Sequence, residues 1–581
     1  MTLNTEMAGL LEEFADRLEA TDVQYKPQVY RRAAENIGAH ATDIGALAAE
    51  GQAAVEEIEG VGDAISSKVM EYVETGSIEE LDALRAELPV EIEELTAVDG
   101  VGPKTVGDLY AALEVETLDD LEAAATAGEI QTISGYGAKT EQNMLDAIPF
   151  ARQAQARALL GEARPIADRL LELVGDHEAV ERATTAGSLR RWKPTVGDVD
   201  VLAASDAGPA VLELLTDWHE TDEVIEAGTT KASVYADGLR VDLRVVSPEE
   251  FGAALQYFTG SRDHNVGLRG RALERDRKMN EYGVFDIADV DDPDAGQRVG
   301  TRIAGETEAE MYEAVGLPWI PPELREDNGE IDAAAGEGWG TLVAEGALRG
   351  DLHTHTDASD GRATLEEMLT AAEARGYEYY AVTDHATGAG MVGGVGLDDA
   401  ELREQIDRVR TAAAAHEMEV FVGVEANIDT EGGLGVADDV LEALDLVVAS
   451  PHASLDGDGT DRLVTAMEHP AVDILGHPTG RLLNQRPGLD VDLDRLAAVA
   501  ASEGVALEIN ANPNRLDLRG AAVRRAVEAG ATVVINTDTH HPSTMGYTRY
   551  GIHTARRGWA RPADVLNAQP LDRVRGFLGL G

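Results

Sequence analysis

The chain has 581 residues, long enough for several domains rather than one. Apolar residues make up 44% of it and aromatic residues only 4%, so aliphatic side chains must fill its cores. It contains no cysteine, which excludes disulfides, thiolate zinc sites and a cysteine nucleophile. Any metal ligands must therefore be histidines and carboxylates.

The net charge is 48 − 108 = −60. The acids are spread through periodic segments instead of forming a disordered tail. Dispersed acid on a folded chain indicates a protein that works in high salt, where screening limits repulsion to roughly 3 Å at 1 M. We therefore expect a salt-loving source organism. Counterion release contributes little to binding at molar salt, so the acidity does not exclude a nucleic-acid partner.

The sequence also gives an expectation about location. No apolar stretch approaches the ~18 residues needed to span a membrane, and the N-terminal segment lacks the pattern of a signal peptide. We expect a soluble cytoplasmic protein with no membrane partner.

Residues 1–150 are predicted to be helical, because alanine, leucine and glutamate dominate and apolar residues recur at spacings of three and four. A glycine turn occurs three times here, each time between two predicted helices. Its glycines are Gly60 and Gly62, Gly100 and Gly102, and Gly135 and Gly137. Such a turn exposes backbone amides at a helix start and suits a phosphate. A single one is equally typical of a helix C-cap, but three together favour a DNA-backbone reader and are similar to helix–hairpin–helix motifs.

Carboxylates gather in the mixed α/β segment that follows. Asp198 and Asp200 are two apart on a predicted strand, and Asp242 lies on a second alternating strand. Three convergent carboxylates repel one another unless cations neutralise them, and two Mg²⁺ ions would serve phosphoryl transfer. A solvated strand face is the plain alternative in so acidic a chain. The preceding Gly187 and Ser188 favour a site, because they place a small turn rich in amides beside the acids.

The string AGSLRRWKPTVGDVDVL (186–202) resembles the nucleotidyltransferase signature of family X DNA polymerases, and QYFTGS (256–261) resembles their nucleotide-binding segment. The resemblance implies that the three aspartates bind two Mg²⁺ or Mn²⁺ ions and that Asp242 helps to activate the primer 3′-OH. It assigns substrate binding to Gly187, Ser188, Arg191, Arg244, Tyr257, Phe258, Gly260, Asn265 and Arg269. Among these, Ser188 and Arg191 hold the triphosphate, Tyr257 and Phe258 face the sugar, and Arg244 orients the acids. Asn265 meets the incoming base and Arg269 the template.

The same resemblance reaches two lysines near the N-terminus. Lys68 falls where some family members carry a Schiff-base lysine, and Lys26 falls near a lysine that binds a 5′-phosphate. A Schiff-base role requires a partly neutral Lys68. A helix lysine that touches DNA phosphate is the alternative.

Residues 347–581 alternate short apolar strands with amphipathic helices, which predicts a parallel α/β fold. Six of the 14 histidines stand at the ends of predicted strands. With three carboxylates they form a candidate ligand set: His353, His355, Asp360, His385, Glu425, His452, His477, Asp538 and His540. The carboxyl ends of barrel strands meet at one face, and such a set suits two or three Mn²⁺, Zn²⁺ or Fe²⁺ ions.

This region resembles the PHP (polymerase and histidinol phosphatase) domain. The resemblance implies a metal-dependent phosphoesterase in which Glu425 bridges metals, and Asp384 and His541 are expected to support the ligands from behind. In similar fused proteins the domain trims 3′ ends.

The predicted fold is multidomain α and α/β. The expected domains are residues 1–90 (helical, DNA-binding and lyase-like), 91–150 (fingers-like helix–hairpin–helix), 151–245 (nucleotidyltransferase palm), 246–322 (thumb), 323–346 (linker) and 347–581 (PHP barrel).

The expected function is gap filling in DNA repair by a family X polymerase from a halophilic archaeon, with a 3′–5′ exonuclease or phosphoesterase in the PHP domain. The expected partners are gapped or nicked DNA and dNTPs, and a monomer is favoured. Two alternatives stay open: a PHP nuclease or phosphatase with a vestigial polymerase, and a scaffold that bridges DNA ends. Intact ligands at both sites argue against the scaffold.

Overall fold

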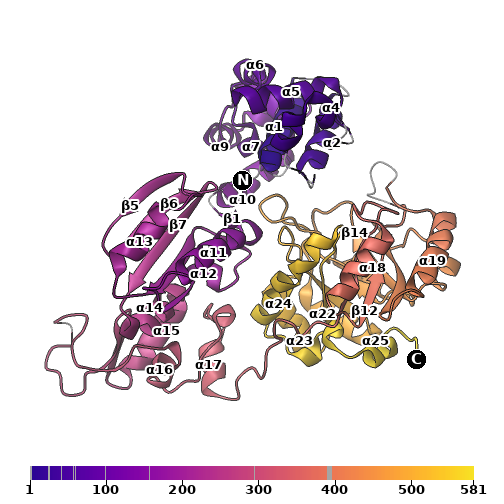
Figure 1. The fold of residues 1–581 in the computed structure, drawn as a ribbon. Helices are drawn as coiled ribbons and strands as arrows, with labels where there is room; N and C mark the ends of the chain where they lie inside the picture. Colours follow the sequence, from indigo (N-terminus) through magenta and orange to yellow (C-terminus); the bar gives the residue numbers. More distant parts are fainter. Residues whose placement is uncertain are drawn as a thin grey trace. The chain divides into compact units, whose positions relative to one another are not determined.

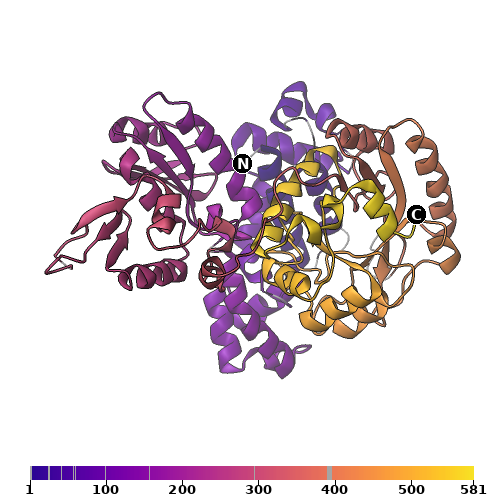
Figure 2. The same cartoon turned by 90° about the horizontal axis from the view of Figure 1, so that it is seen from below.

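The computed structural model describes residues 3–581 except 22, 24, 25, 39, 41, 43, 57, 59, 99, 156, 294 and 389–394. The chain divides into two compact units, Met1–Arg157 with Asn484–Arg486, and Ala158–Leu483 with Pro487–Gly581. In Figures 1 and 2 the helices of the first unit are drawn from indigo to purple. No helix among the described residues is long and apolar enough to cross a membrane.

The first unit is helical, as predicted. Its helices are α1 (Leu3–Ala20), α2 (Lys26–Gly38), α3 (Ile44–Glu50), α4 (Gln52–Val55), α5 (Asp63–Thr75), α6 (Glu79–Glu87), α7 (Ile92–Thr96), α8 (Pro103–Leu113), α9 (Leu118–Ala127) and α10 (Ala138–Gln155). Two aliphatic clusters fill it, one around α1, α2 and α5 and the other around α8, α9 and α10. Phe14 stacks on Tyr30 in the first, with ring centroids 4.5 Å apart.

The three glycine turns share one geometry. The first glycine of each has a left-handed φ, between +79° and +102°, that side chains rarely adopt. The second glycine is the N-cap of α5 or α8, or directly precedes α10. An added Cβ at the second glycine of each turn would meet nothing within 4 Å, so an approaching phosphate finds these backbone amides open.

The second unit begins with the palm, a five-stranded sheet in the order β2-β4-β7-β6-β5. The palm elements are β1 (Ala158–Leu159), α11 (Leu160–Gly175), β2 (Arg182–Thr185), α12 (Gly187–Arg190), β3 (Thr195–Val196), β4 (Val199–Ala204), α13 (Gly208–Thr216), β5 (Glu223–Ala227), β6 (Lys231–Ala236) and β7 (Leu239–Val246). β4 and β7 are parallel neighbours, and α11 and α13 pack with the sheet in one apolar cluster.

A small thumb follows, with a three-stranded antiparallel sheet in the order β10-β9-β8. Its elements are α14 (Phe251–Thr259), α15 (Arg262–Leu273), β8 (Arg277–Asn280), β9 (Gly283–Asp286), β10 (Thr301–Ala304), α16 (Glu308–Glu313) and α17 (Glu330–Ala335). The expected linker 323–346 contributes to this thumb. Arg325 and Glu330 are fully buried there, and Leu324, Ala334 and Leu342 join the apolar cluster of α15 and α16.

The remaining residues form seven parallel strands in sequential order, surrounded by helices (Figure 1). The elements are β11 (Gly350–Asp351), α18 (Leu365–Ala374), β12 (Tyr379–Val382), α19 (Asp399–Ala413), β13 (Glu419–Ile428), α20 (Asp438–Leu441), β14 (Leu446–Pro451), α21 (Thr460–Met467), β15 (Ile474–Leu475), α22 (Leu493–Glu503), β16 (Ala506–Asn510), α23 (Gly520–Glu528), β17 (Val533–Asn536), α24 (Thr548–Arg557) and α25 (Leu571–Phe577). A parallel bridge between Thr354 and Thr539 joins the segments after β11 and β17 and nearly closes a barrel.

Successive residues of each barrel strand enter different cores, which explains why the strands read as continuous apolar runs. Leu446 and Val448 of β14 pack in one cluster, and Val447 and Ala449 pack in another with α21, α22 and α23. Both faces of a parallel strand are buried, so both need apolar side chains. The predicted fold class, a helical N-terminal region, a palm and thumb and a C-terminal α/β barrel, is confirmed.

Candidate active sites

The three palm aspartates converge. β4 and β7 run parallel with Asp200 directly opposite Asp242, and Asp198 immediately precedes β4. One carboxylate oxygen from each lies within 4.8 Å of the others. This spacing matches three ligands around divalent cations, because carboxylates so close repel one another without positive charge between them.

Gly187 lies directly against this cluster. An added Cβ at Gly187 would stand 2.1 Å from Oδ2 of Asp200, and the residue has a φ of +60°. The N–H of Ala186 donates to the carbonyl of Asp200 at 2.8 Å. The turn before Ser188 therefore brings its backbone beside the acids, as the sequence predicted.

Two cations hold Asp242. Nζ of Lys231 lies 2.6 Å and Nε of Arg240 3.0 Å from its carboxylate. Burial alone would raise the pKa of Asp242, but its bonds to Lys231 and Arg240 lower it. Burial and the two other aspartates raise the pKa of Asp200 to about 7.

The role of Arg244 in orienting the acids stays a prediction, and its positive charge acts to lower the pKa of Asp200. The guanidinium of Arg244 lies over the ring of Phe258, 4.4 Å from its centroid, and Lys231 and Arg240 make the ion pairs to Asp242 instead. The reason is the antiparallel β6–β7 pairing, which places Ser233 opposite Asp242 and Lys231 two residues away on the same face.

The predicted triphosphate side is partly preorganised. Arg191 donates to the carbonyl of Thr259, beside Gly260, and its Nε lies 3.1 Å from Glu326. The neighbouring Arg190 pairs with buried Glu308 at 2.7 Å. Arg191 thus connects the turn of Ser188 to the Thr259–Gly260 segment.

The remaining predicted substrate residues differ in burial and in their hydrogen bonds. Tyr257 and Phe258 are half-buried and pack edge to face, with centroids 5.2 Å apart. Asn265 is buried; its amide oxygen accepts from Gln256 and its amide nitrogen donates to the carbonyl of Tyr257, so its contact with the incoming base stays a prediction. Arg269 is exposed on α15 and is open to a strand.

In the barrel, Glu425 is the centre of the second cluster. Its Oε2 lies 3.3 Å from His353, 3.5 Å from His355 and 2.8 Å from His385. Its Oε1 lies 3.3 Å from Nε2 of His452 and 3.0 Å from Nε2 of His477. The two oxygens thus face different histidine groups, which is the arrangement of a bridging carboxylate.

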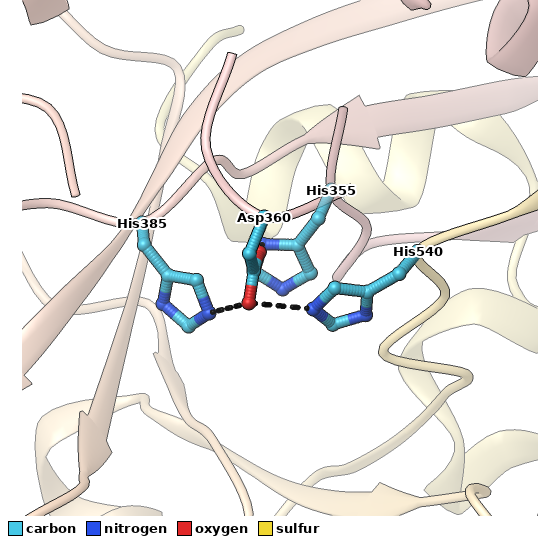
Figure 3. A group of neighbouring side chains, drawn as sticks. All are labelled: His355, Asp360, His385 and His540. Atoms are coloured by element: carbon cyan, nitrogen blue, oxygen red, sulfur yellow. Dashed lines mark ion pairs between the residues drawn. The ribbon is translucent and has the colours of Figure 1, made fainter. Parts of the chain in front are cut away.

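Asp360 organises the other side of the cluster. Its carboxylate lies 3.3 Å from Nε2 of His385 and 3.1 Å from Nε2 of His540, and His355 stands behind it (Figure 3). Asp538 lies 3.1 Å from Nε2 of His355. All nine predicted ligands therefore belong to one connected cluster, in which His355, His385 and Glu425 are shared between candidate ion positions.

The buried donor set fits metal ions. Among the described residues, several buried side-chain atoms of the cluster make no well-aligned hydrogen bond, although they lie close to other members of it: Nε2 of His353, both ring nitrogens of His355, Nδ1 of His385, Nδ1 of His477 and Oε2 of Glu425. Burial would raise the pKa of Glu425, yet His385, His353 and His452 hold it well below its usual value. Unpaired imidazole nitrogens around an ionised carboxylate are the donors that Mn²⁺, Zn²⁺ and Fe²⁺ accept.

Residues behind the ligands fix their orientation. Nδ1 of His353 lies 2.8 Å from buried Glu508, His452 bonds to Asn427, and Asn510 donates to Asp538 at 3.1 Å. Sequence reasoning missed Glu508, although an acid inside the apolar run of β16 was a usable signal, since buried acids are nearly always paired.

Of the two residues expected to support the ligands, Asp384 accepts hydrogen bonds from the hydroxyls of Thr356 and Ser359 and from Gln405. His541 is instead exposed and bonds to Ser543, so it is not placed behind the ligands.

Lys68 is held as a cation. Its Nζ lies 2.7 Å from Glu80 and 5.2 Å from the ring centroid of Phe14. Burial lowers the pKa of Lys68, but Glu80 and Tyr30 outweigh burial and raise it. This environment does not favour the neutral amine of a Schiff-base lysine. Lys26 is exposed at the start of α2.

Known families match four segments of the chain. Residues 254–326 match the DNA polymerase beta thumb, residues 351–512 the PHP domain, residues 2–78 a helix-hairpin-helix domain, and residues 92–148 a SAM-like helix-hairpin-helix tandem.

Three curated proteins show the extent of the similarity. The DNA polymerase/3′-5′ exonuclease PolX of Bacillus subtilis (strain 168) is 35% identical over 528 residues, 90% of each chain. DNA polymerase lambda of Rattus norvegicus is 28% identical over 46% of this chain and 48% of its own. A probable phosphatase of Shewanella sp. (strain MR-4) is 30% identical over 34% of this chain and 78% of its own.

The fold and the two clusters define a nucleotidyltransferase joined to a metal-dependent PHP barrel. The similarity to the Bacillus protein over nine-tenths of both chains then settles the family: the chain belongs to the family X DNA polymerases that carry a PHP domain.

Proposed function

We propose that this polymerase fills short gaps in DNA during repair and that its barrel trims 3′ ends. The observation that carries the polymerase part is the cluster of Asp198, Asp200 and Asp242, with ligand oxygens within 4.8 Å of one another beside Gly187. The name of the Bacillus relative, which joins polymerase and 3′-5′ exonuclease, supports the pairing of activities.

In the palm, Asp198, Asp200 and Asp242 would hold Mg²⁺ or Mn²⁺. The ions would supply charge neutralisation for the attacking and leaving oxygens. Lys231 and Arg240 keep Asp242 ionised and fixed in place, so that it can assist proton removal from the primer 3′-OH. Ser188 and Arg191 would bind the triphosphate, which then faces the 3′-OH in line.

In the barrel, the nine ligands would hold two or three Mn²⁺, Zn²⁺ or Fe²⁺ ions, with Glu425 as the bridge. Bound ions would activate water and polarise the phosphoester. His353 is aimed by Glu508 and His452 by Asn427, which fixes which ring nitrogen of each faces Glu425. This preorganised cluster supports a working hydrolase.

The partners and source follow from the same features. Gapped or nicked DNA and dNTPs are the proposed substrates, and the open amides of Gly62, Gly102 and Gly137 would hold DNA phosphates. We favour a monomer. The net charge of −60 supports a halophilic source, with an archaeon as our proposal.

A lyase step at Lys68 would require the amine to leave Glu80 and lose its proton. Borohydride trapping on DNA with a 5′-deoxyribose phosphate tests this, with Glu80→Gln beside the parent. A covalent adduct that is stronger in Glu80→Gln would identify Lys68 as a nucleophile restrained by its ion pair. Absence of adduct in both would leave it a structural residue.

A second candidate function is a phosphatase or nuclease with a vestigial polymerase. The similarity of the barrel to a probable phosphatase over 78% of that protein favours it. The palm geometry argues against it, because a vestigial site has no reason to keep Gly187 tight against Asp200 and two cations on Asp242.

The deciding experiment uses a 5′-labelled primer at a one-nucleotide gap, with dNTPs and Mn²⁺ in concentrated KCl. The parent runs beside Asp198→Ala/Asp200→Ala and His353→Ala/His355→Ala. Primer extension that is lost only in the aspartate variant, with shortening lost only in the histidine variant, supports both activities. Shortening without extension in the parent would leave the phosphoesterase as the working enzyme.

A further inference from the structure

A cavity of about 590 Å³ lies where the palm and the segment 323–328 meet the barrel within the second unit. Its lining holds six lysines and arginines against three glutamates, whereas the whole chain has 48 against 108. The six are Lys193, Arg481, Arg519, Arg524, Arg525 and Arg557. Basic side chains are thus concentrated around this cavity although the chain as a whole is strongly acidic, which indicates a binding role.

The acids around the cavity neutralise only part of this charge. Glu326 is shared by two of the six, at 3.5 Å from Lys193 and 3.2 Å from Arg557, and by Arg191 at 3.1 Å. Glu528 pairs with Arg524 at 2.9 Å, and Asp494 pairs with Arg525 at 2.8 Å. Glu323 is bonded to His553 and Arg556. Several positive charges therefore remain for an outside anion.

The arginines at the start of α23 and within it face the cavity. Arg519, the N-cap residue, is exposed, and its guanidinium makes no hydrogen bond or ion pair with the described residues. The guanidinium carbon of Arg524 lies over the ring of Trp559, 3.7 Å from its centroid, and both residues line the cavity. Burial and neighbouring cations lower the pKa values of Lys193 and Arg481, as crowding of positive charge requires.

The lining is connected to both metal clusters through short pieces of chain. Lys193 is five residues after Ser188, in the turn that begins against Asp200. On the barrel side, Leu516 lines the cavity, and Nε of its neighbour Arg515 lies 3.7 Å from the ligand Asp538. A bound strand would thus be flanked by the two sites.

We propose that this cavity binds an unpaired stretch of DNA strand close to its 3′ end, between the polymerase and PHP sites. A site of a few hundred Å³ takes a short flexible segment rather than a duplex. Grooves for single strands combine cations along the backbone with flat groups on which bases stack, and the Arg524–Trp559 pair is such a group. The inference rests on the proposed function, because it assumes that one strand visits both sites.

Strand binding is tested with Arg519→Gln/Arg525→Gln, since both side chains are exposed. The matched control is Arg403→Gln/Arg410→Gln on α19, which removes the same charge outside the cavity and likewise breaks one surface ion pair. We expect at least tenfold weaker binding of fluorescent oligo(dT) in the cavity variant only. Its log–log salt slope should fall by about 1.4, two phosphate contacts at ~0.7 each.

In the cavity variant, the rate of trimming of a 3′ overhang should fall together with oligonucleotide binding. Its hydrolysis of bis(p-nitrophenyl) phosphate should not change, because this small substrate does not need the cavity. Equal effects in the two double variants, or none in either, would overturn the inference. If dTMP displaced the fluorescent oligo(dT) as effectively as unlabelled oligo(dT) at the same total phosphate concentration, the cavity would be a site for single nucleotides instead. Failure of the parent to hydrolyse either substrate would count against the PHP proposal, and the binding assay would still test the cavity.

Because the chain has no cysteine, location can be tested directly. Ala521→Cys stands in the cavity lining, and Ala414→Cys is an exposed control next to α19. We expect an oligonucleotide with a pyridyl disulfide near its 3′ end to exchange with the thiol of Ala521→Cys, releasing pyridine-2-thione, and not with Ala414→Cys. The reverse, or equal trapping, would contradict the proposed path even if the charge variants fail to fold.

Discussion

Glu508 and Asp473 are both carboxylates of the barrel, but their surroundings differ. Glu508 is fully buried and bonds to His353, to the N–H of His477 and to Asn536. The carboxylate of Asp473, just before β15, accepts one hydrogen bond from the described residues, that of the Val447 N–H, and the residue is half-buried. The partners of Glu508 compensate the burial of its charge, whereas the single bond to Asp473 does not.

Glu508→Gln is expected to weaken metal binding at the barrel by roughly 10–100-fold, because an amide cannot accept all the bonds that now orient His353. Metal titration and overhang trimming measure this, and gap filling should stay unchanged. Glu503→Gln, at the exposed end of α22, is the control. Unchanged metal affinity in Glu508→Gln would show that the bond to His353 is dispensable.

Asp473→Asn is expected to stabilise the protein at pH 8 and to have little effect near pH 4. Burial raises the pKa of Asp473 from 3.8 to about 7 in the folded protein. The unfolded chain therefore ionises first, so stability is lost as pH rises from about 4 through 7. Removing that ionisation should contribute about 1–3 kcal/mol at pH 8.

Melting temperatures at pH 4 and pH 8 measure the effect of Asp473→Asn. Asp461→Asn, on an exposed residue of α21, serves as the control and should not change them. A variant that melts at the parent temperature at both pH values would show that Asp473 is better solvated than its surroundings indicate.

At the scale of elements, the site chemistry is placed by the ends of strands and the turns that follow them. β4 and β7 bring Asp200 and Asp242 together through a parallel register, and α12 begins at Gly187, against Asp200. In the barrel, most of the predicted ligands stand just after a strand end, whereas Glu425 lies within β13 and Asp360 lies in the segment after β11. Parallel strands bring these positions to one face. A change in one turn should therefore affect one site only.

Gly187→Ala is expected to abolish most gap filling and leave hydrolysis at the barrel intact. The new methyl would stand 2.1 Å from the carboxylate of Asp200, at a φ of +60° that alanine avoids, so Asp200 must move. The strain should cost about 1–2 kcal/mol of stability. Gap extension and bis(p-nitrophenyl) phosphate hydrolysis are measured on the same preparation.

The control for Gly187→Ala is Gly175→Ala, because a methyl at the end of α11 meets nothing within 4 Å. It should keep both activities. Full gap filling by Gly187→Ala would mean that Asp200 does not need its observed position.

At the scale of the whole molecule, a net charge of −60 acts on stability as a sum over many exposed acids. Most of them have no ion-pair partner to gain, since acids outnumber bases by more than two to one. Self-repulsion of this kind is long-range at low ionic strength and is screened by salt.

Raising KCl from 0.1 M to 2 M is therefore expected to raise the melting temperature by ten degrees or more, because the Debye length falls from ~10 Å to a few Å. Differential scanning fluorimetry measures this. Sucrose at matched osmolality is the control, because it favours compact states without screening charge. Equal melting temperatures at both KCl concentrations would contradict a salt-adapted protein.

The sequence by itself determined the class of the fold and most of the ligand sets. Alternating apolar runs, glycine turns and short motifs are local features, and local features can be recognised in the sequence alone. Asp198, Asp200 and Asp242 and all nine barrel ligands were predicted in this way, and each set comes together in the structure.

Tertiary structure alone decided which groups stand behind those ligands and between the modules. Lys231 reaches Asp242 through the register of β6 on β7, and Glu508 meets His353 across 155 residues of chain. The segment 323–346 looked like a linker because its composition is acidic and rich in glycine, yet Arg325 is buried against Glu308. Such pairings depend on elements far apart in sequence meeting in space, and no local pattern encodes them.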